Sequence, residues 1–218
     1  MVKKKIIDKA KASADEAIEK LVNDEDISFE TVLDVGSGQG LHSDYFLSHG
    51  KKVTAVDFGT SEYYLKRNSN MDVEFIIGDF NEIDFGDKQY DCVWCSHILE
   101  HQRNVGQFLE KVISLTSDNG YICITVPPHK DKIVGGHVTW WNAGLLLYNL
   151  VSAGLDCSEA MVRTYGYNIS VIVKKKIFKL PNNLDSDKGD IEKLSKYFPT
   201  GCKVQGFNGI IPSLNWHK

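Results

Sequence analysis

Apolar and amphipathic segments alternate along most of this chain. Five short apolar runs have the length and β-branched content of buried strands, and they span residues 32–35, 53–56, 73–77, 92–95 and 121–126. Helical patterns, with apolar positions three or four apart, span residues 43–48, 61–67, 105–115 and 140–153. Two late runs, near residues 155–162 and at 169–173, are expected to pair with each other. Strands that alternate with helices predict an α/β fold with a parallel sheet covered on both faces.

The two ends of the chain depart from this alternation. Residues 3–22 carry apolar side chains every four positions and charges on the other face, which predicts an amphipathic helix. Residues 181–218 are rich in Asn, Asp, Gly and Pro, and only residues 191–197 show a short helical pattern. We expect this last segment to be a tail that packs on the domain. Its expected anchors are the apolar residues Phe207, Ile210, Ile211 and Trp216.

The composition of the chain disfavours two kinds of partner molecule, nucleic acids and membranes. The net charge of −4 and the scattered basic residues argue against a nucleic-acid partner. No apolar run approaches the length of a membrane span, and none follows the N-terminal lysines as a secretory signal requires. Five cysteines fit free thiols in a reducing cytoplasm, and Cys92 and Cys95 are expected on opposite faces of a strand. We therefore expect a cytoplasmic protein with no nucleic-acid or membrane partner.

Three alternating glycines follow the first predicted strand. Gly36, Gly38 and Gly40 come directly after the segment TVLDV, where a strand of a parallel sheet reaches its carboxyl end. Ligands bind beyond such ends, and glycine lets the backbone turn tightly and approach a ligand closely. A dinucleotide site would need a third glycine at the position of Leu41. The spacing is therefore G-x-G-x-G, which disfavours a nicotinamide oxidoreductase.

The stretch LDVGSGQG resembles motif I of the class I S-adenosylmethionine-dependent methyltransferases. Four further segments resemble family motifs at successive strand ends, in the family's order: VTAVDFG, FIIGDF, YDCVWCSHILEH and DNGYICITVP. The resemblance covers roughly residues 30–175. It implies a three-layer Rossmann-like α/β sandwich, with a mostly parallel seven-stranded sheet and an antiparallel last strand. It also implies an N-terminal helix over the cofactor site (1–25), a methyltransferase domain (26–178) and a C-terminal tail (179–218).

The resemblance implies S-adenosyl-L-methionine as the cofactor and S-adenosyl-L-homocysteine as the product. Asp34 and the Gly36 backbone would lie near the methionine amino group. Asp57 would hold the ribose, because a carboxylate accepts hydrogen bonds from both hydroxyls. The full set of residues expected at the cofactor is Asp34, Gly36, Ser37, Gly38, Gly40, Asp57, Phe58, Asp79, Phe80, Ser96 and His97.

Adenine is expected at the third strand end. There Asp79 would accept a hydrogen bond from the exocyclic amine and Phe80 would pack on the ring, whereas Ser96 and His97 would lie near the methionine end. Two of the carboxylates have alternative roles, since Asp57 can cap a turn and Asp79 can serve as a turn residue in GDF.

The segment HILEH allows two interpretations. His97 and His101 spell H-x-x-E-H, which on a helix would be a zinc-peptidase pattern. The motif follows a strand directly and no third ligand is evident, so we predict no metal. In small-molecule methyltransferases LEH is typical at this point, and the resemblance makes His101 a candidate general base, since imidazole accepts a proton near neutral pH. The alternative is that His101 only hydrogen-bonds a loop.

A long loop, VPPHKDKIVGGHVTWWN, follows the fifth predicted strand. Its glycine pair could let it move as a lid. By resemblance its histidine and aromatic residues face the acceptor, which makes His137 a second candidate base. Basic and aromatic groups together favour a polar acceptor, such as a sugar, a nucleotide-sugar or a phosphorylated metabolite. The residues expected to bind it are His129, Lys130 and Trp140, each of which has an alternative role at the loop surface or in helix packing.

Methyl transfer from a sulfonium needs the nucleophile aligned with the methyl group, and a hydroxyl nucleophile also needs a base. We therefore expect an O-methyltransferase that acts on a small-molecule acceptor, such as a sugar, nucleotide-sugar or surface-glycan precursor. N-methylation, of a small metabolite, a base or a protein, is an alternative. A non-catalytic module that binds S-adenosylmethionine is another, and whether the protein forms a homodimer stays open.

Overall fold

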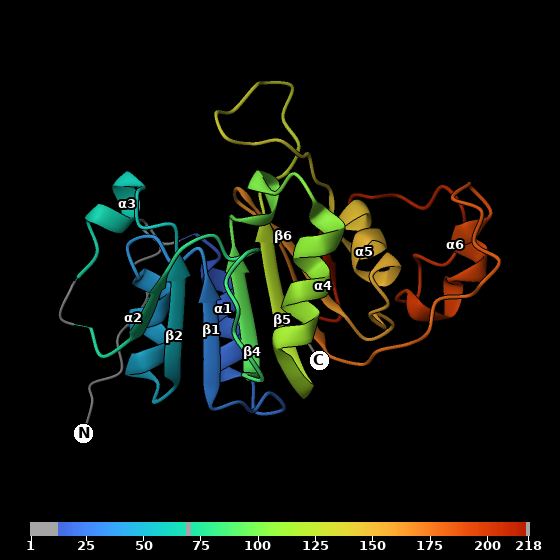
Figure 1. Cartoon of the computed structure of the whole chain (residues 1–218). Helices are drawn as coiled ribbons and strands as arrows, with labels where there is room; N and C mark the ends of the chain where they lie inside the picture. Colours follow the sequence, from blue (N-terminus) through green and yellow to red (C-terminus); the bar gives the residue numbers. More distant parts are fainter. Residues whose placement is uncertain (1–12, 69–70, 217–218) are drawn as a thin grey trace.

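A computed structural model describes residues 13–68 and 71–216 (Figure 1). Its centre is one eight-stranded sheet in the order β3-β2-β1-β4-β5-β7-β6-β8. In that order the strands are Glu74–Ile77, Lys52–Asp57, Thr31–Val35, Tyr90–Ser96, Thr116–Val126, Asn168–Lys174, Met161–Tyr165 and Ser213–Leu214. Adjacent strands from β3 to β5 are parallel, and β7 is antiparallel to both of its neighbours. The order reverses between β1 and β4, where an open α/β sheet places its ligand.

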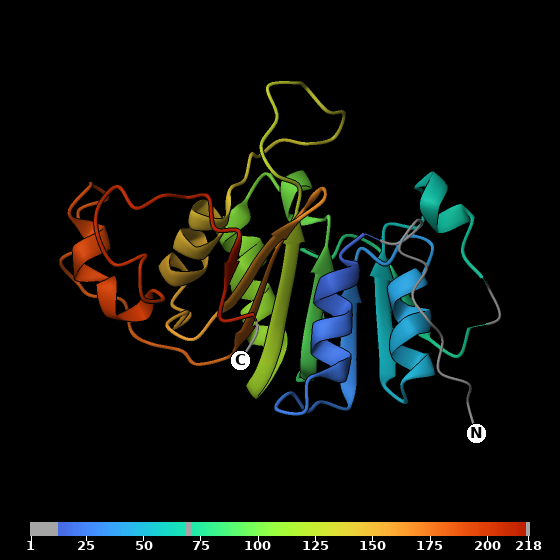
Figure 2. The ribbon, with the colours of Figure 1, turned by 180° about the vertical axis from the view of Figure 1, so that it is seen from behind.

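Helices cover both faces of the sheet, as Figures 1 and 2 show from opposite sides. The helices α1 (Asp15–Asn23) and α2 (Leu41–Ser48) pack on one face, and α4 (Val105–Leu115) and α5 (Ala143–Ser152) pack on the other. Alternation within each strand divides the core between the faces, because successive side chains point in opposite directions. The predicted three-layer α/β sandwich is thus confirmed.

One detail of the sheet differs from the prediction. The short strand β8 pairs with β6 and makes eight strands instead of seven. Strand β7, the last of the seven predicted strands, is antiparallel as expected and lies between β5 and β6. Hydrophobic periodicity could not reveal β8, since it has only the two residues Ser213 and Leu214.

The helices match the predicted segments with shifted ends. The helix predicted at residues 3–22 is described from Asp15 onward, and its residues 3–12 lie outside the described part. The helix predicted at 140–153 begins only at Ala143, because the Asn142 side chain caps it by accepting a hydrogen bond from the Leu145 amide (2.7 Å). The remaining short helices are α3 (Glu62–Leu65), η1 (Leu99–His101), α6 (Asp190–Lys193) and η2 (Ser195–Tyr197).

The C-terminal segment packs beside α5 and returns to the sheet through β8. Ile211 and Trp216 are buried, and Phe207 packs partly buried against the core. Ile210, the fourth predicted anchor, is 70% exposed, so that prediction was wrong. Adjacent residues of an extended tail point in opposite directions, and Ile211 takes the inward position.

The cysteines occupy the predicted positions. Cys92 packs with the α1 and α2 side of the core and Cys95 with the α4 and α5 side. All five cysteines are buried, free thiols. Among the described helices, none combines the length and the apolar character needed to cross a membrane.

Candidate active site

The glycine loop turns sharply at the carboxyl end of β1. Gly36, Gly38 and Gly40 have φ angles of +76°, +51° and +76°, which L side chains rarely adopt. A Cβ on Gly36 would lie only 3.0 Å from the Ile98 side chain. The Gly36 and Ser37 amides both donate to the Val56 carbonyl (2.8 and 3.1 Å). The loop is therefore joined to the end of β2 at the point where the strand order reverses.

Asp57, at the end of β2, holds this loop in place. One carboxylate oxygen accepts from the Gly38 amide (2.9 Å) and the other from the Gly59 amide (3.0 Å). The turn-capping role weighed for Asp57 is thus present in the structure. Each carboxylate oxygen has a second lone pair, so the same side chain retains the capacity to accept from ribose hydroxyls.

Asp34 is buried at the end of β1. Its carboxylate accepts a hydrogen bond from the Ser43 hydroxyl of α2 (2.6 Å). Burial raises the pKa of Asp34 to about 7, although the Ser43 hydrogen bond acts in the opposite direction. A buried carboxyl of this kind gains from a cation beside it, as the amino group of a bound methionine moiety would supply.

His97 lies just beyond β4 with a φ angle of +54°. Its Nδ1 faces Glu100 Oε1 (3.2 Å), and its Nε2 faces Asn168 Oδ1 (2.9 Å) at the start of β7. Burial opposes the charged imidazolium, but the hydrogen bonds to Glu100 and Asn168 outweigh it and raise the pKa of His97.

The segment that leads into α1 lies across this end of the sheet. Ser13 Oγ is 3.3 Å from Ser96 Oγ, and the Ser13 carbonyl is 2.7 Å from His42 Nε2. The Ala14 amide donates to Asn168 Oδ1 (3.3 Å). Sequence reasoning missed Ser13, His42 and Asn168. Only His42 carried a signal, namely its place directly after the glycine loop.

Phe58, Asp79 and Phe80, which were also predicted at the cofactor, differ in exposure. Phe58 is exposed at the end of β2. Asp79 Oδ1 accepts from both the amide and the side-chain nitrogen of Asn81 (2.9 and 3.1 Å), so the turn role weighed for Asp79 is also present. The Phe80 ring is only 6% exposed and packs between Phe85 and Phe108, which leaves little of it for a ligand. The buried position follows from its place in the core on the α4 side.

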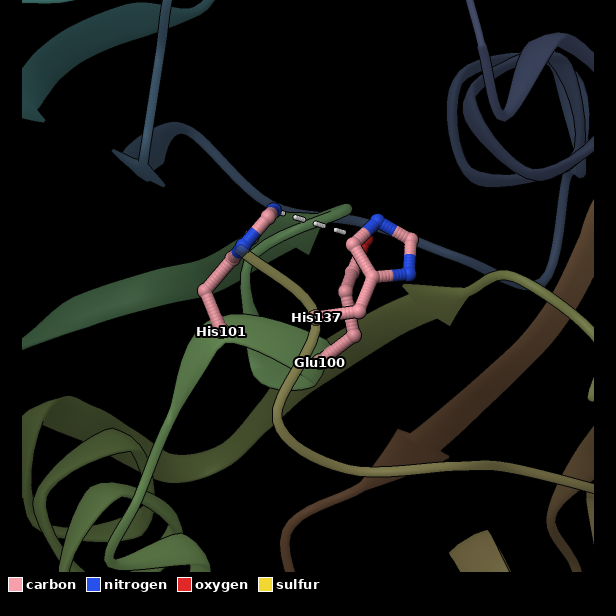
Figure 3. Close-up of side chains that lie close together, drawn as sticks. All are labelled: Glu100, His101 and His137. Atoms are coloured by element: carbon pink, nitrogen blue, oxygen red, sulfur yellow. Dashed lines mark ion pairs between the residues drawn. The ribbon is translucent and has the colours of Figure 1, made fainter. Parts of the chain in front are cut away.

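The two candidate bases meet, although they are far apart in sequence. Figure 3 shows Glu100 and His101 of η1 beside His137 of the long loop. The His101 and His137 rings are 5.0 Å apart and perpendicular, and His101 Nε2 is 3.9 Å from Glu100 Oε1. The Val138 amide donates to the Glu100 carbonyl (2.9 Å) and so joins the loop backbone to η1. His101 Nδ1 lies 2.8 Å from the Gly136 carbonyl, so the loop contact weighed for His101 exists as well.

The zinc-peptidase arrangement of His97 and His101 does not form. η1 is a single 3₁₀ turn that begins at Leu99, and His97 precedes it in a left-handed conformation. His97 therefore faces Asn168, whereas His101 faces the long loop.

The residues predicted to bind the acceptor lie along the long loop, which extends above the carboxyl edge of the sheet in Figure 1. The His129 and Trp140 rings are 4.9 Å apart, and the Lys130 ammonium lies 3.8 Å over the Tyr167 ring. Trp141, by contrast, is buried in the core, and its Nε1 donates to Thr139 Oγ1 (2.9 Å).

Comparison with known proteins agrees with this arrangement. Residues 33–124 match the family model described as "Methyltransferase domain", a span that runs from β1 to β5 and includes the glycine loop, Asp57 and η1. Residues 33–124 therefore form a class I S-adenosylmethionine-dependent methyltransferase domain. The predicted family and cofactor are therefore confirmed, and S-adenosylmethionine is the cofactor that this methyltransferase fold uses.

Curated proteins similar to this chain include ubiquinone biosynthesis O-methyltransferases. The protein from Rickettsia conorii is 33% identical over 134 residues, which cover 56% of this chain and 45% of that protein. The protein from Rickettsia felis is 32% identical over 136 residues, or 57% of this chain and 55% of that protein. The chain thus spans about half the length of the curated relatives it matches.

Solved structures of other methyltransferases share the fold. One is a 1,6-didemethyltoxoflavin-N1-methyltransferase from Burkholderia thailandensis with bound S-adenosylhomocysteine, with a TM-score of 0.62 and 21% identity over 78% of this chain and 80% of that chain. Another is a SAM-dependent methyltransferase from Archaeoglobus fulgidus, with a TM-score of 0.61 and 17% identity over 73% of this chain and 92% of that one. At these identities the likeness concerns the fold alone.

Proposed function

We propose that this methyltransferase is an O-methyltransferase that acts on a small polar acceptor. The observation that carries the proposal is the meeting of His101 and His137 at the carboxyl edge of the sheet, since a hydroxyl nucleophile requires a base there. The names of the two curated relatives described above, both ubiquinone biosynthesis O-methyltransferases, support oxygen as the attacked atom.

The reaction is an in-line displacement. The acceptor oxygen forms a bond to the methyl carbon while the methyl–sulfur bond breaks and its electron pair goes to sulfur. The hydroxyl proton passes to an imidazole nitrogen. The chain mainly aligns the reactants, since the sulfonium supplies its own activation.

Both histidines are suited to accept that proton. Burial lowers the pKa of His137, and the neighbouring imidazoles of His101 and His97 lower it further. The Glu100 carboxylate acts in the opposite direction but does not cancel these effects. His137 is therefore neutral near pH 7 and can act as a base. His101 has its Nδ1 against the Gly136 carbonyl, which places the ring proton on Nδ1 and leaves the Nε2 lone pair available.

The acceptor class stays a proposal. The relatives' names favour an acceptor in ubiquinone biosynthesis and offer nothing for the sugar, nucleotide-sugar or surface-glycan precursor predicted from loop composition. N-methylation rests on fold alone, since the toxoflavin enzyme is 21% identical. We favour a small molecule over a nucleic acid because the chain has a net charge of −4.

A binding experiment tests the cofactor half of the proposal. Calorimetric titration with S-adenosylhomocysteine should show one site, and Asp57→Ala should weaken it by at least about tenfold, because the glycine loop and the ribose lose the same carboxylate. His101→Ala and His137→Ala should keep wild-type affinity. Absence of binding to the wild type would overturn the proposal.

An activity experiment tests the chemical half. Methyl transfer from labelled cofactor should be assayed with a panel of phenols, sugars and amines. We expect transfer to a hydroxyl that falls by about 100-fold in His101→Ala or His137→Ala with cofactor binding unchanged. Transfer to an amine, or full activity in both variants, would contradict an O-methyltransferase with a histidine base. Cofactor binding without transfer to any member of the panel would favour the non-catalytic module.

A further inference from the structure

We propose that Glu100, His101 and His137 together bind a divalent first-row transition-metal ion. Two imidazole nitrogens and one carboxylate oxygen form a common set of ligands for such ions. The binding itself is independent of the function proposed above. The catalytic part of the inference, a role for the ion at the acceptor oxygen, rests on that function.

The spacing of the three ligand atoms suits a metal ion. One ligand atom from each of Glu100, His101 and His137 lies within 4.8 Å of the other two. Ligands about 2.0–2.2 Å from a tetrahedral ion are roughly 3.3 Å apart, so closure by about 1–1.5 Å completes the site. His137 lies next to Gly135 and Gly136, and it can supply this small movement because it belongs to a loop and not to a helix.

The His101 ring is already arranged as a ligand. Its Nδ1 faces the Gly136 carbonyl at 2.8 Å, so this nitrogen carries the proton and donates. Nε2 therefore presents a lone pair, and it is also the nitrogen that faces Glu100 at 3.9 Å. Metal-binding histidines nearly always donate their other ring N–H to a carbonyl or a carboxylate, which fixes tautomer and orientation.

Glu100 gives a second and independent indication. Its side chain is fully buried, yet its Oε2 atom has no hydrogen-bond partner among the described residues. Oε1 faces His97 Nδ1 at 3.2 Å, so His97 orients the carboxyl group. A buried oxygen without a partner is costly unless something outside the chain satisfies it. A cation between Glu100 and the two histidines would do so.

The ligand set favours a transition metal over Mg²⁺ or Ca²⁺, which prefer sites built from oxygen atoms. Three protein ligands leave at least one position open for another oxygen. A divalent ion lowers the pKa of a hydroxyl that it binds and could thus replace a histidine as the means of deprotonating the acceptor. The histidine pair would then hold the ion.

The test uses the full chain, freed of metal with a chelator, and Zn²⁺ as the probe. Calorimetric titration should show one Zn²⁺ per chain. His101→Ala, His137→Ala and Glu100→Gln should each weaken binding by about tenfold or more. His129→Ala is the matched control, because His129 is an exposed histidine of the same loop outside the cluster, and its affinity should stay within about twofold.

Co²⁺ gives a readout that does not depend on activity. Bound to the cluster, it should produce the visible absorption of low-coordinate cobalt, and His137→Ala should abolish that absorption. His137 lies on the loop, so this variant should keep the wild-type melting temperature, whereas Glu100→Gln alters a buried group. Zn²⁺ binding that is equal in the wild type and the three cluster variants, or no binding, would overturn the proposal.

The two proposals can fail separately. Metal binding by the cluster without cofactor binding would overturn the methyltransferase function and leave the metal site standing. Methyl transfer that is unchanged after chelation and in the presence of Zn²⁺ would overturn the ion's catalytic role and leave the histidine base in place.

Discussion

Asp34 shows how strongly the surroundings of a single side chain decide its chemistry. It lies near the end of β1, and burial there raises its pKa to about 7. Asp57 lies 23 residues later, at the end of β2. Its two carboxylate oxygens accept hydrogen bonds from loop amides and so stabilise the glycine loop. Two carboxylates at adjacent strands therefore differ in surroundings, since Asp34 is buried and bonded to Ser43 whereas Asp57 supports the glycine loop.

Cofactor affinity should depend on pH through Asp34. Only the ionised carboxylate attracts the amino group of the ligand, so the affinity for S-adenosylhomocysteine should increase by roughly tenfold between about pH 6 and about pH 8. Asp34→Asn should bind more weakly at the higher pH and lose most of this increase. Calorimetric titrations across the range would measure both.

The free protein should show the opposite trend in stability. A carboxyl whose pKa is raised by folding favours the protonated native state, so its contribution to the free energy of unfolding falls as pH rises from its ordinary value towards about 7. Asp34→Asn should remove this part of the decline in melting temperature. A wild-type affinity that is flat with pH, together with an unchanged decline in the variant, would contradict the assignment.

The long loop and η1 act as a pair. Neither forms a site alone, because η1 is one turn and the loop is irregular over residues 127–142. Hydrogen bonds from the Val138 amide to the Glu100 carbonyl and from His101 to the Gly136 carbonyl join them. Gly136 has a φ angle of +82°, and a Cβ there would lie 3.0 Å from His101 Nδ1. A glycine is thus required where the loop meets the histidine.

Gly136→Ala should separate the loop from His101. The alanine would be strained in the left-handed conformation by about 1–2 kcal/mol, and its methyl group would displace the ring. Nitrogen NMR of the His101 ring should show loss of the single Nδ1-protonated tautomer, and methyl transfer should fall by about tenfold or more. Gly135→Ala is the control, because nothing lies within 4 Å of a Cβ there and its φ is not positive. Equal effects of the two changes would contradict this role for Gly136.

The C-terminal segment ties the far edge of the sheet to the core. Leu214 of β8 pairs with Val162 of β6, and Trp216 then enters the core between the sheet and α1. The chain therefore ends its described course on the same face as α1, on the opposite side of the sheet from α4 and α5 (Figure 2). This path makes the tail a part of the domain's packing.

Removal of the Trp216 ring should lower the stability of the entire domain. Trp216→Ala should reduce the free energy of unfolding by about 3–5 kcal/mol, because the ring is nearly fully buried. Ile210→Ala is the matched change, since Ile210 is exposed, and it should alter stability by no more than about 0.5 kcal/mol. Urea denaturation would measure both, and a small effect of Trp216→Ala would show that the tail is not part of the cooperative core.

Sequence patterns were sufficient for those features that depend on neighbouring residues. The order of strands and helices, the two faces of β1 and the placement of Cys92 and Cys95 on opposite sides follow from periodicities of 2 and 3.6 residues. The glycine loop was also evident, because a tight turn with positive φ at three alternating positions needs glycine. The predicted ends of the helices were less accurate, because the start of α5 depends on the side-chain cap that Asn142 forms.

The contacts that build the site depend on strand order and loop closure, which no local pattern records. His97 meets Asn168 across 71 positions and Ser13 meets Ser96 across 83, because β7 inserts beside β5 and the chain before α1 crosses the sheet end. The same folding brings Gly136 to His101 across 35 positions and places His137 beside a buried Glu100. Periodicity assigns each residue to a face of its own element, but the distance between two elements is set by how the sheet and its loops pack.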